Sequence, residues 1–306
     1  MLWVALTIVA AIAVGVEAER RKGPRAGRAA RGVLWLMLYV LMPPVVFFNI
    51  ARLEITADVG AGIALGWAAL ALSALTAWGV GRRLLRLERP SAGVLSIVAM
   101  QGNTGILGLP FVAAVLGFDR LPEAVAYDAL VQAPVFLLLS FAVAAATGTR
   151  AGEGVRQRVR AFFFRNPPLA AVALALVAPD ALAPDVLVDA SRVLVLAMVP
   201  LGFFAVGVTM AEEAEEGALR FPPPFTRGVG AALVLRLCVA PLLLLALAAP
   251  LIDLPGTFLL LAAMPAGLHI VMLAHAYGLD LPFAAGAIVW TTAVWMVLAT
   301  GVIIVV

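Results

Sequence analysis

The stretch MQGNTGILGLP, residues 100–110, is a polar and glycine-rich interruption inside an apolar segment of membrane-spanning length. In hydrocarbon, each unpaired backbone N–H or C=O group costs several kcal/mol, so irregular backbone persists there only inside protein or beside water. A second interruption, MPAGLH at residues 264–269, occupies the corresponding place in the second half of the chain. Two interrupted helices at matching positions best indicate the binding site of a transporter.

The composition predicts an all-α polytopic membrane protein. Of the 306 residues 64% are apolar and 13% charged, and the mean hydropathy is +1.07, which leaves too little polar surface for a soluble globule. A membrane-spanning helix needs roughly 20 residues. Ten stretches approach this length: 2–17, 32–51, 59–80, 91–116, 122–147, 166–182, 189–210, 228–249, 256–276 and 283–305.

Basic residues gather in alternate loops between these stretches, which predicts the orientation of the chain. They are Arg20, Arg21, Lys22, Arg25, Arg28, Arg31, Arg82, Arg83, Arg86, Arg89, Arg150, Arg156, Arg158, Arg160, Arg165, Arg220 and Arg227. Because cytoplasmic loops carry excess Lys and Arg, we expect a cell-membrane protein with both termini outside the cytoplasm. The basic residues explain the high pI without nucleic-acid binding.

An internal repeat divides the chain into residues 1–148 and 149–306. Met42-Pro43-Pro44 in the second stretch matches Met198-Val199-Pro200 in the seventh, and Gly117 to Pro122 matches Gly278 to Pro282. Each half holds five predicted spans, and an odd number places the halves in opposite orientations. The sequence therefore predicts two inverted five-helix repeats in which helices four and nine are broken.

Glycines and a proline weaken the fourth helix. Gly102, Gly105 and Gly108 remove side chains, and Pro110 removes a hydrogen-bond donor. A kinked, tightly packed helix explains these four residues equally well. The polar Gln101, Asn103 and Thr104 favour a binding site instead.

We expect Gln101, Gly102, Asn103 and Thr104 to contact a substrate, because a helix that restarts after the break directs its N–H groups and positive dipole end towards the cavity. This arrangement favours an anion. His269, placed by Pro265 in the second break, is either a buried structural histidine or a substrate contact that titrates near neutral pH.

Three further polar residues lie within predicted spans. Asp128 and Gln132 are four residues apart and share a helix face, and Arg236 lies in the eighth span. In one interpretation, they are structural groups, each with its own hydrogen-bond partners. In the other, Asp128 and Gln132 are coupling or supporting residues, and Arg236 is a brace or an anion contact.

The sequence lacks the motifs of common enzymes and of ATP hydrolysis, so we expect no catalytic residues and no cofactor. Cys238 is the single cysteine, which excludes an intrachain disulfide, and the two histidines, His269 and His275, are six residues apart. We therefore expect no metal site.

Several motifs together resemble the auxin efflux carrier family, which includes plant auxin carriers and bacterial permeases assigned to malate or malonate. The motifs are Gly102 to Pro110, Met42-Pro43-Pro44, Arg165-Asn166-Pro167, Arg236 followed by Pro241, and Ala263-Met264-Pro265. The resemblance implies a scaffold of helices one, two, six and seven. It also implies a transport unit of helices three to five and eight to ten, with the broken helices crossing at the substrate site.

The resemblance also implies a homodimer in the lipid bilayer and a fold related to the bile-acid symporters. Asn103 matches the family's asparagine in span four, and Pro110 and Pro265 match its crossover prolines. His269 stands where the family often has a second asparagine, and Ala266 where a second proline is common.

The sequence thus predicts a secondary carrier of a small organic anion, such as a carboxylate, that works by an elevator or rocking motion. Whether a proton or sodium couples transport stays open. The alternatives are a sodium-coupled symporter of the bile-acid type, a membrane sensor that binds the ligand without moving it, and an intramembrane hydrolase.

Overall fold

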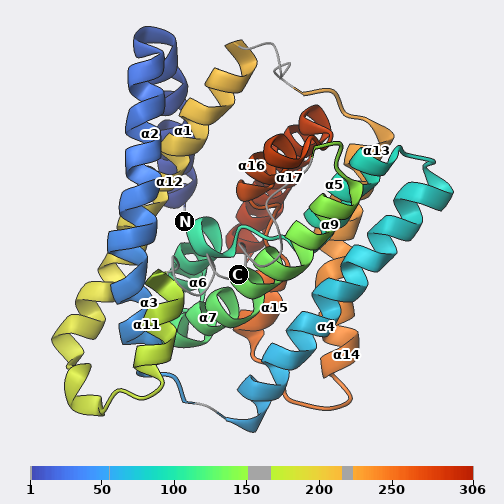
Figure 1. The fold of residues 1–306 in the computed structure, drawn as a ribbon. Helices are drawn as coiled ribbons and strands as arrows, with labels where there is room; N and C mark the ends of the chain where they lie inside the picture. Colours follow the sequence, from blue (N-terminus) through green and yellow to red (C-terminus); the bar gives the residue numbers. More distant parts are fainter. Residues whose placement is uncertain (1, 55, 151–166, 216–222, 306) are drawn as a thin grey trace.

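The computed structural model describes residues 2–54, 56–150, 167–215 and 223–305, and every regular element in them is helical (Figure 1). The basic residues from 156 to 165, the Arg165-Asn166 part of the family motif and Arg220 lie outside the described residues. The longer helices are α1 (Leu2–Lys22), α2 (Pro24–Leu36), α3 (Met42–Ile50), α4 (Ala57–Gly79), α5 (Arg89–Met100), α6 (Leu109–Val115), α7 (Leu121–Tyr127), α9 (Phe141–Thr147), α11 (Pro167–Ala175), α12 (Asp185–Glu215), α13 (Arg227–Val234), α14 (Ala240–Ala248), α15 (Gly256–Ala262), α16 (His269–Tyr277) and α17 (Leu281–Val305).

Six helical segments of the described residues are long and apolar enough to cross a membrane. They are Pro24–Ile50, Ala57–Leu84, Phe118–Thr147, Asp185–Thr209, Arg227–Ala248 and Leu281–Ala299. The other predicted stretches also contain helices, namely α1, α5 with α6, α11, and α15 with α16. The prediction of an all-helical membrane protein is confirmed to this extent, and the remaining four spans stay a prediction.

The helices form two groups. In the first group α1 and α2 pack along α12, and α3 packs between α11 and α12. In the second group α4 packs on α5 and α14, and α17 packs on α5, α13 and α16. Figure 1 shows the first group on the left and the second on the right, with α6 and α7 between them.

Small residues allow α1 and α12 to approach closely. A Cβ atom at Gly15 would lie 2.9 Å from the backbone nitrogen of Val208, and one at Gly207 would lie 3.0 Å from the Cα atom of Ile12. Such close backbone approach is a usual way to pack helices in lipid, where apolar surface alone provides no driving force.

Four prolines follow short π-helical turns. These turns are η1 (Met37–Leu41), η3 (Thr104–Gly108), η5 (Asp128–Gln132) and η8 (Leu235–Val239), and the second residue after each is Pro43, Pro110, Pro134 or Pro241. A proline inside a helix clashes with the carbonyl four residues earlier and cannot donate to it. A widened turn before the proline relieves both problems, and such turns are frequent at functional sites.

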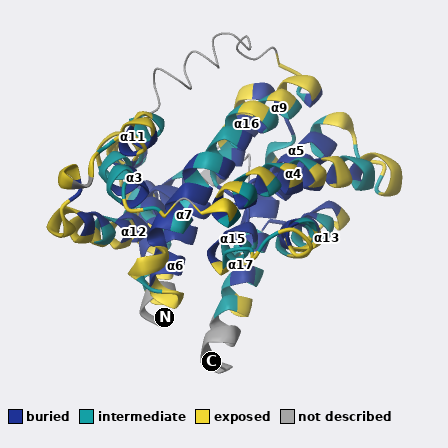
Figure 2. Ribbon diagram, turned by 90° about the horizontal axis from the view of Figure 1, so that it is seen from below, coloured by how far each residue is buried: buried dark blue, intermediate teal, exposed yellow. Residues whose placement is uncertain are grey.

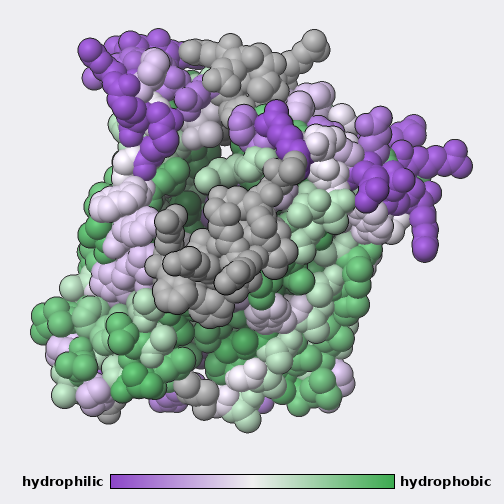
Figure 3. All heavy atoms as spheres, in the orientation of Figure 1, coloured by the Kyte–Doolittle hydropathy of each residue, from purple (hydrophilic) through white to green (hydrophobic). Residues whose placement is uncertain are grey.

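The basic residues gather at one end of the molecule. The hydrophilic surface concentrates at the top of Figure 3, around the α1–α2 turn and the turn before α5. Arg89 donates to the carbonyl of Ala146 at the end of α9, and Arg31 lies 3.8 Å from Glu212 near the end of α12. We call this the arginine-rich end.

Equivalent hydroxyl groups begin α4 and α13, the helices of predicted spans three and eight. Thr56 accepts a 3.2 Å hydrogen bond from the backbone nitrogen of Val59, and Thr226 accepts one of 3.2 Å from Val229. Each threonine is thus the N-cap of its helix.

Two hydroxyl–carboxylate pairs join the starts of other helices. Ser91, near the start of α5, donates a 2.7 Å hydrogen bond to Asp280, which precedes α17. Thr257, at the start of α15, donates a 2.7 Å hydrogen bond to Glu123 in α7. The start of each interrupted helix is therefore tied to the beginning of the last predicted span of the other half of the chain.

The core lies between the two groups. Every residue of α5 from 92 to 100 is buried, so this helix has no face towards lipid. Figure 2 shows buried ribbon gathering around α7, α15 and α17, with more exposed ribbon on outer helices such as α4 and α13. The two interruptions therefore lie inside protein, as irregular backbone at membrane depth requires.

Candidate functional site

The predicted interruptions are real breaks in the helices. The first break, residues 101–103, separates α5 from η3, and Gln101 has the extended angles φ −110° and ψ 102°. The second break, residues 263–268, separates α15 from α16. Gly102 and the pair Pro265 and Gly267 are poor helix formers at these positions.

The two breaks pair with each other through their backbones. Gly102 and Ala266 form an isolated antiparallel bridge. The Asn103 N–H donates to the carbonyl of Pro265 at 2.8 Å, and the Gly267 N–H donates to the carbonyl of Gln101 at 3.0 Å. These bonds satisfy groups that the broken helices leave without partners.

A side-chain network links the breaks to α16 and η5. Gln132 donates to the Gln101 side-chain oxygen at 2.6 Å and to the carbonyl of Met100 at 3.1 Å. His269 Nε2 lies 3.2 Å from the same Gln101 oxygen. Phe136 packs edge-on against the imidazole, with the ring centroids 4.3 Å apart. The structure thus brings together three polar side chains, Gln101, Gln132 and His269, all of which the sequence singled out.

Asp128 lies beside the start of the helix that follows the first break. Thr104 donates its hydroxyl to the Asp128 carboxylate. A Cβ atom at Gly105 would lie 3.4 Å from that carboxylate, so the glycine leaves it room. The carboxylate accepts at a helix N-terminus, where a negative charge is favoured.

Arg236 lies behind the breaks. Its guanidinium is fully buried and donates to the carbonyls of Met264, Ala99 and Ala262 at 2.7, 3.0 and 2.6 Å. It borders neither of the two cavities described below. The structure therefore places Arg236 against the ends of α5 and α15 and outside the lining of these two cavities.

The remaining predicted residues pack the breaks together. A Cβ atom at Gly108 would lie 2.6 Å from Leu261 and 3.3 Å from Met264, so this glycine permits η3 to approach α15. Pro110 is buried in the first turn of α6. The carbonyl of Pro265 accepts from Asn103, as described above.

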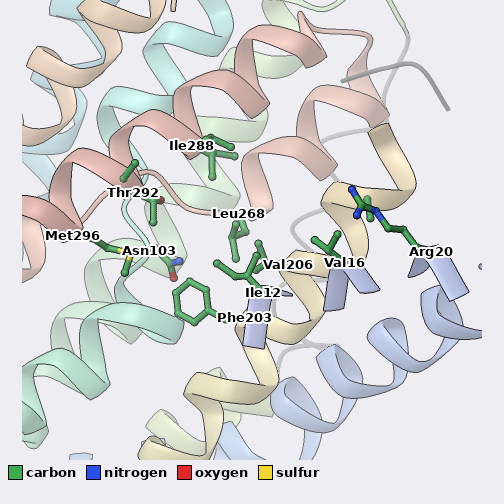
Figure 4. A pocket seen from close by; sticks show the side chains of 13 residues that line it. Ile12, Val16, Arg20, Asn103, Phe203, Val206, Leu268, Ile288, Thr292 and Met296 are labelled. Carbon is green, nitrogen blue, oxygen red and sulfur yellow. The ribbon is translucent and has the colours of Figure 1, made fainter. Parts of the chain in front are cut away.

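Two cavities lined by described residues adjoin the breaks. The break cavity, of about 440 Å³, borders the predicted site and the apolar residues of α12, α16 and α17. Its polar lining is Gln101, Gly102, Asn103, Thr104, Gly105, Asp128, Gln132, Thr209 and His269. The side cavity, of about 410 Å³, lies between α1, α12 and α17 (Figure 4).

The Asn103 side chain borders both cavities. Figure 4 shows it beside Leu268 and Phe203, whereas Arg20 lies at the far end of the side cavity. The residue is 6% exposed, and its amide makes no hydrogen bond to any described residue. This amide and the Gln101 amide nitrogen, which is buried and also has no hydrogen-bond partner, are therefore available to a ligand at the first break.

Sequence reasoning missed two residues that support the breaks. Thr291 of α17 accepts a 3.2 Å hydrogen bond from the backbone nitrogen of Ala266. Phe136 orients His269, as described above. The hydroxyl pair Thr291-Thr292 in an apolar span was a usable signal for Thr291, whereas Phe136 resembles any other apolar residue of its helix.

A helical chain with several apolar segments and paired breaks at its centre defines a multi-pass membrane protein. The sequence model of the family described as "Membrane transport protein" matches residues 5–151 and 158–303. The chain belongs to this family, which is the auxin efflux carrier family that its motifs resemble. It is also 24% identical over 270 residues to an uncharacterized transporter of Methanocaldococcus jannaschii, covering 84% of this chain and 83% of the relative.

Proposed function

We propose that this protein is a secondary carrier of a small organic anion, such as a carboxylate, which binds at the paired breaks. The observation that carries the proposal is the Asn103 amide, which is buried, borders both cavities and makes no hydrogen bond to a described residue. A buried amide without a partner is costly unless a ligand or water satisfies it.

The electrostatics of the breaks favour an anion. The helices that start at Thr104 and His269 have no side-chain cap, and the positive ends of their dipoles favour a negative charge at the breaks. The Asp128 carboxylate lies at the first of these helix starts. Arg236 adds a buried positive charge that has no ion-pair partner among the described residues. His269 and Asn103 provide further donors. Gln101 contacts the imidazole of His269, and Thr104 donates to Asp128.

The proposed architecture is a pair of inverted five-helix repeats, residues 1–148 and 149–306. The threonine caps of α4 and α13 support it, as do the hydroxyl–carboxylate pairs at the starts of α5 and α15. Gly117 and Gly278, which follow the two interrupted helices, both have positive φ angles, of 90° and 64°. The family match also falls into two segments of similar length.

Transport would move the second helix group, as a transport unit, against the first group, as a scaffold. Both proposed units border both cavities, so relative motion would change access to Asn103. We assign the arginine-rich end to the cytoplasm and the termini to the opposite side. We propose a homodimer on the basis of the family resemblance. We also propose His269 and Asp128 as the proton-coupling groups.

The test is the current that a panel of mono- and dicarboxylates induces in proteoliposomes on a solid-supported membrane. We expect a saturable current whose half-saturating concentration rises roughly 10- to 100-fold in Asn103→Ala, because a hydrogen bond to a charged group contributes about 1.5–3 kcal/mol. Thr76→Ala, on the exposed face of α4, is the matched control and should resemble the unmodified protein.

If Asn103→Ala leaves the substrate-induced current unchanged, the proposal that the substrate binds at Asn103 is refuted. Saturable binding without any flux, measured on the same folded protein, would show a sensor instead of a carrier.

A further inference from the structure

Three backbone carbonyl oxygens converge behind the paired breaks. Ala99 belongs to the last turn of α5, Ala262 ends α15, and Met264 follows in the second break. The C-terminal end of a helix carries the negative end of its dipole. In carriers with broken helices, such ends and unwound carbonyls are where coupling sodium ions are coordinated.

The Arg236 guanidinium fills this position. Each of its three nitrogens donates to one of the three carbonyls, at distances of 2.6 to 3.0 Å. The side chain comes from η8, the π-helical turn that precedes Pro241. A planar, permanently charged fork suits such a cluster of acceptors better than an ammonium group does.

The first break is shaped around this charge. A Cβ atom at Gly102 would lie 2.8 Å from Nη2 and 3.3 Å from Cζ of Arg236. Only glycine leaves the guanidinium in place without displacing the paired backbone. The interruption that suggests a binding site thus also accommodates a buried cation that borders neither cavity.

We propose that Arg236 is a resident cation that takes the place of a coupling sodium ion, so that a fixed positive charge lies behind the backbone of the substrate site. This inference rests on the proposed anion carrier and names its coupling: no sodium ion accompanies the substrate. Arg236 is a positioning residue, since it acts through the backbone of the breaks.

The first experiment follows thermal unfolding of the purified protein and needs no substrate. The midpoint of the unmodified protein should be the same in sodium chloride as in choline chloride. Arg236→Ala should lower it by roughly 5 °C or more, because three charge-assisted hydrogen bonds are lost. Millimolar methylguanidinium, or sodium, should restore at least half of that loss by occupying the vacated carbonyls.

Gln132→Ala is the matched control, because Gln132 is also buried and also bonds to the first break. Its lowered midpoint should not respond to either cation. A sodium-specific stabilisation of the unmodified protein, or an Arg236→Ala midpoint that neither cation raises, would overturn the proposal.

A second experiment covers the case in which Arg236→Ala does not fold. Arg236→Lys keeps the charge with a different set of donors, and its unfolding midpoint should also be independent of sodium. In proteoliposomes, substrate currents of the unmodified protein and of Arg236→Lys should not change when choline replaces sodium. If either protein requires sodium for its current, the proposal that Arg236 is a resident cation is refuted. If no current is seen and the unfolding midpoint is independent of sodium, only the proposal of a carrier is refuted.

Discussion

Arg192 of α12 lies 3.7 Å from Asp119 in the turn before α7. In the part of the chain that the structure describes, this is the one ion pair between the first helix group and the segment that begins predicted span five, which belongs to the proposed transport unit. It lies at the end of α12 opposite the arginine-rich end, and the Asp119 side chain is 96% exposed. An exposed pair of this kind contributes less than about 1 kcal/mol. It therefore identifies where the two segments meet but adds little to the stability of their contact.

This junction allows a direct test of movement between the groups. With the exposed Cys238 first changed to serine, cysteines at 119 and 192 joined by a short thiol cross-linker should stop transport, because the link spans scaffold and transport unit. Cysteines at 52 and 185 are the control, since Arg52 and Asp185 pair within the first group. Flux should survive that link, and equal inhibition by both would argue against relative motion.

Gly267→Ala should disable the site without unfolding the protein. A Cβ atom there would lie 2.9 Å from Nδ1 and 3.0 Å from Nε2 of His269, so the imidazole must leave Gln101. We expect roughly tenfold weaker substrate binding, the effect of about 1.4 kcal/mol, measured by equilibrium titration. Gly60→Ala has no heavy atom within 4 Å of the new methyl group and should bind normally.

The lining of the break cavity predicts the shape of the substrate. Its polar groups lie along the breaks, and residues such as Leu34, Phe136 and Val289 line the rest. An anion with one carboxylate and an apolar body should therefore compete better than a dicarboxylate, whose second charge would be desolvated. Each added methylene should lower the inhibition constant by about fourfold until the cavity is full, as 0.8 kcal/mol per buried methylene requires.

Ala133→Phe tests the same lining from the protein side, because Ala133 borders this cavity. It should exclude the longest anions of the series first while the shortest still bind. A uniform loss across the series would place the substrate elsewhere.

His269→Asn should keep transport but flatten its dependence on pH between about 5 and 8, the range in which histidine ordinarily titrates. Asp128 is the other titratable side chain of the break cavity, so Asp128→Asn is measured in parallel. A pH profile that persists in His269→Asn but disappears in Asp128→Asn would assign the proton to the carboxylate.

Hydrophobic segments and helix-breaking residues explain how far the sequence prediction reached. An all-helical membrane protein follows from apolar runs, and the breaks follow from glycines and prolines next to polar residues. The sequence left open whether Arg236 is a brace or an anion contact. The direction in which a helix residue points within a bundle depends on which helices pack around it. The π-helical turn that carries it, like the contact between Phe136 and His269, arises from tertiary packing that local patterns do not encode.

The pairing of Gly102 with Ala266 uses backbone atoms alone. Side chains at neighbouring positions, such as Asn103 and Leu268, can therefore be exchanged while the two chain segments remain joined. Within a family of this kind, ligand preference can diverge through a few substitutions, while the geometry that presents the ligand is inherited unchanged.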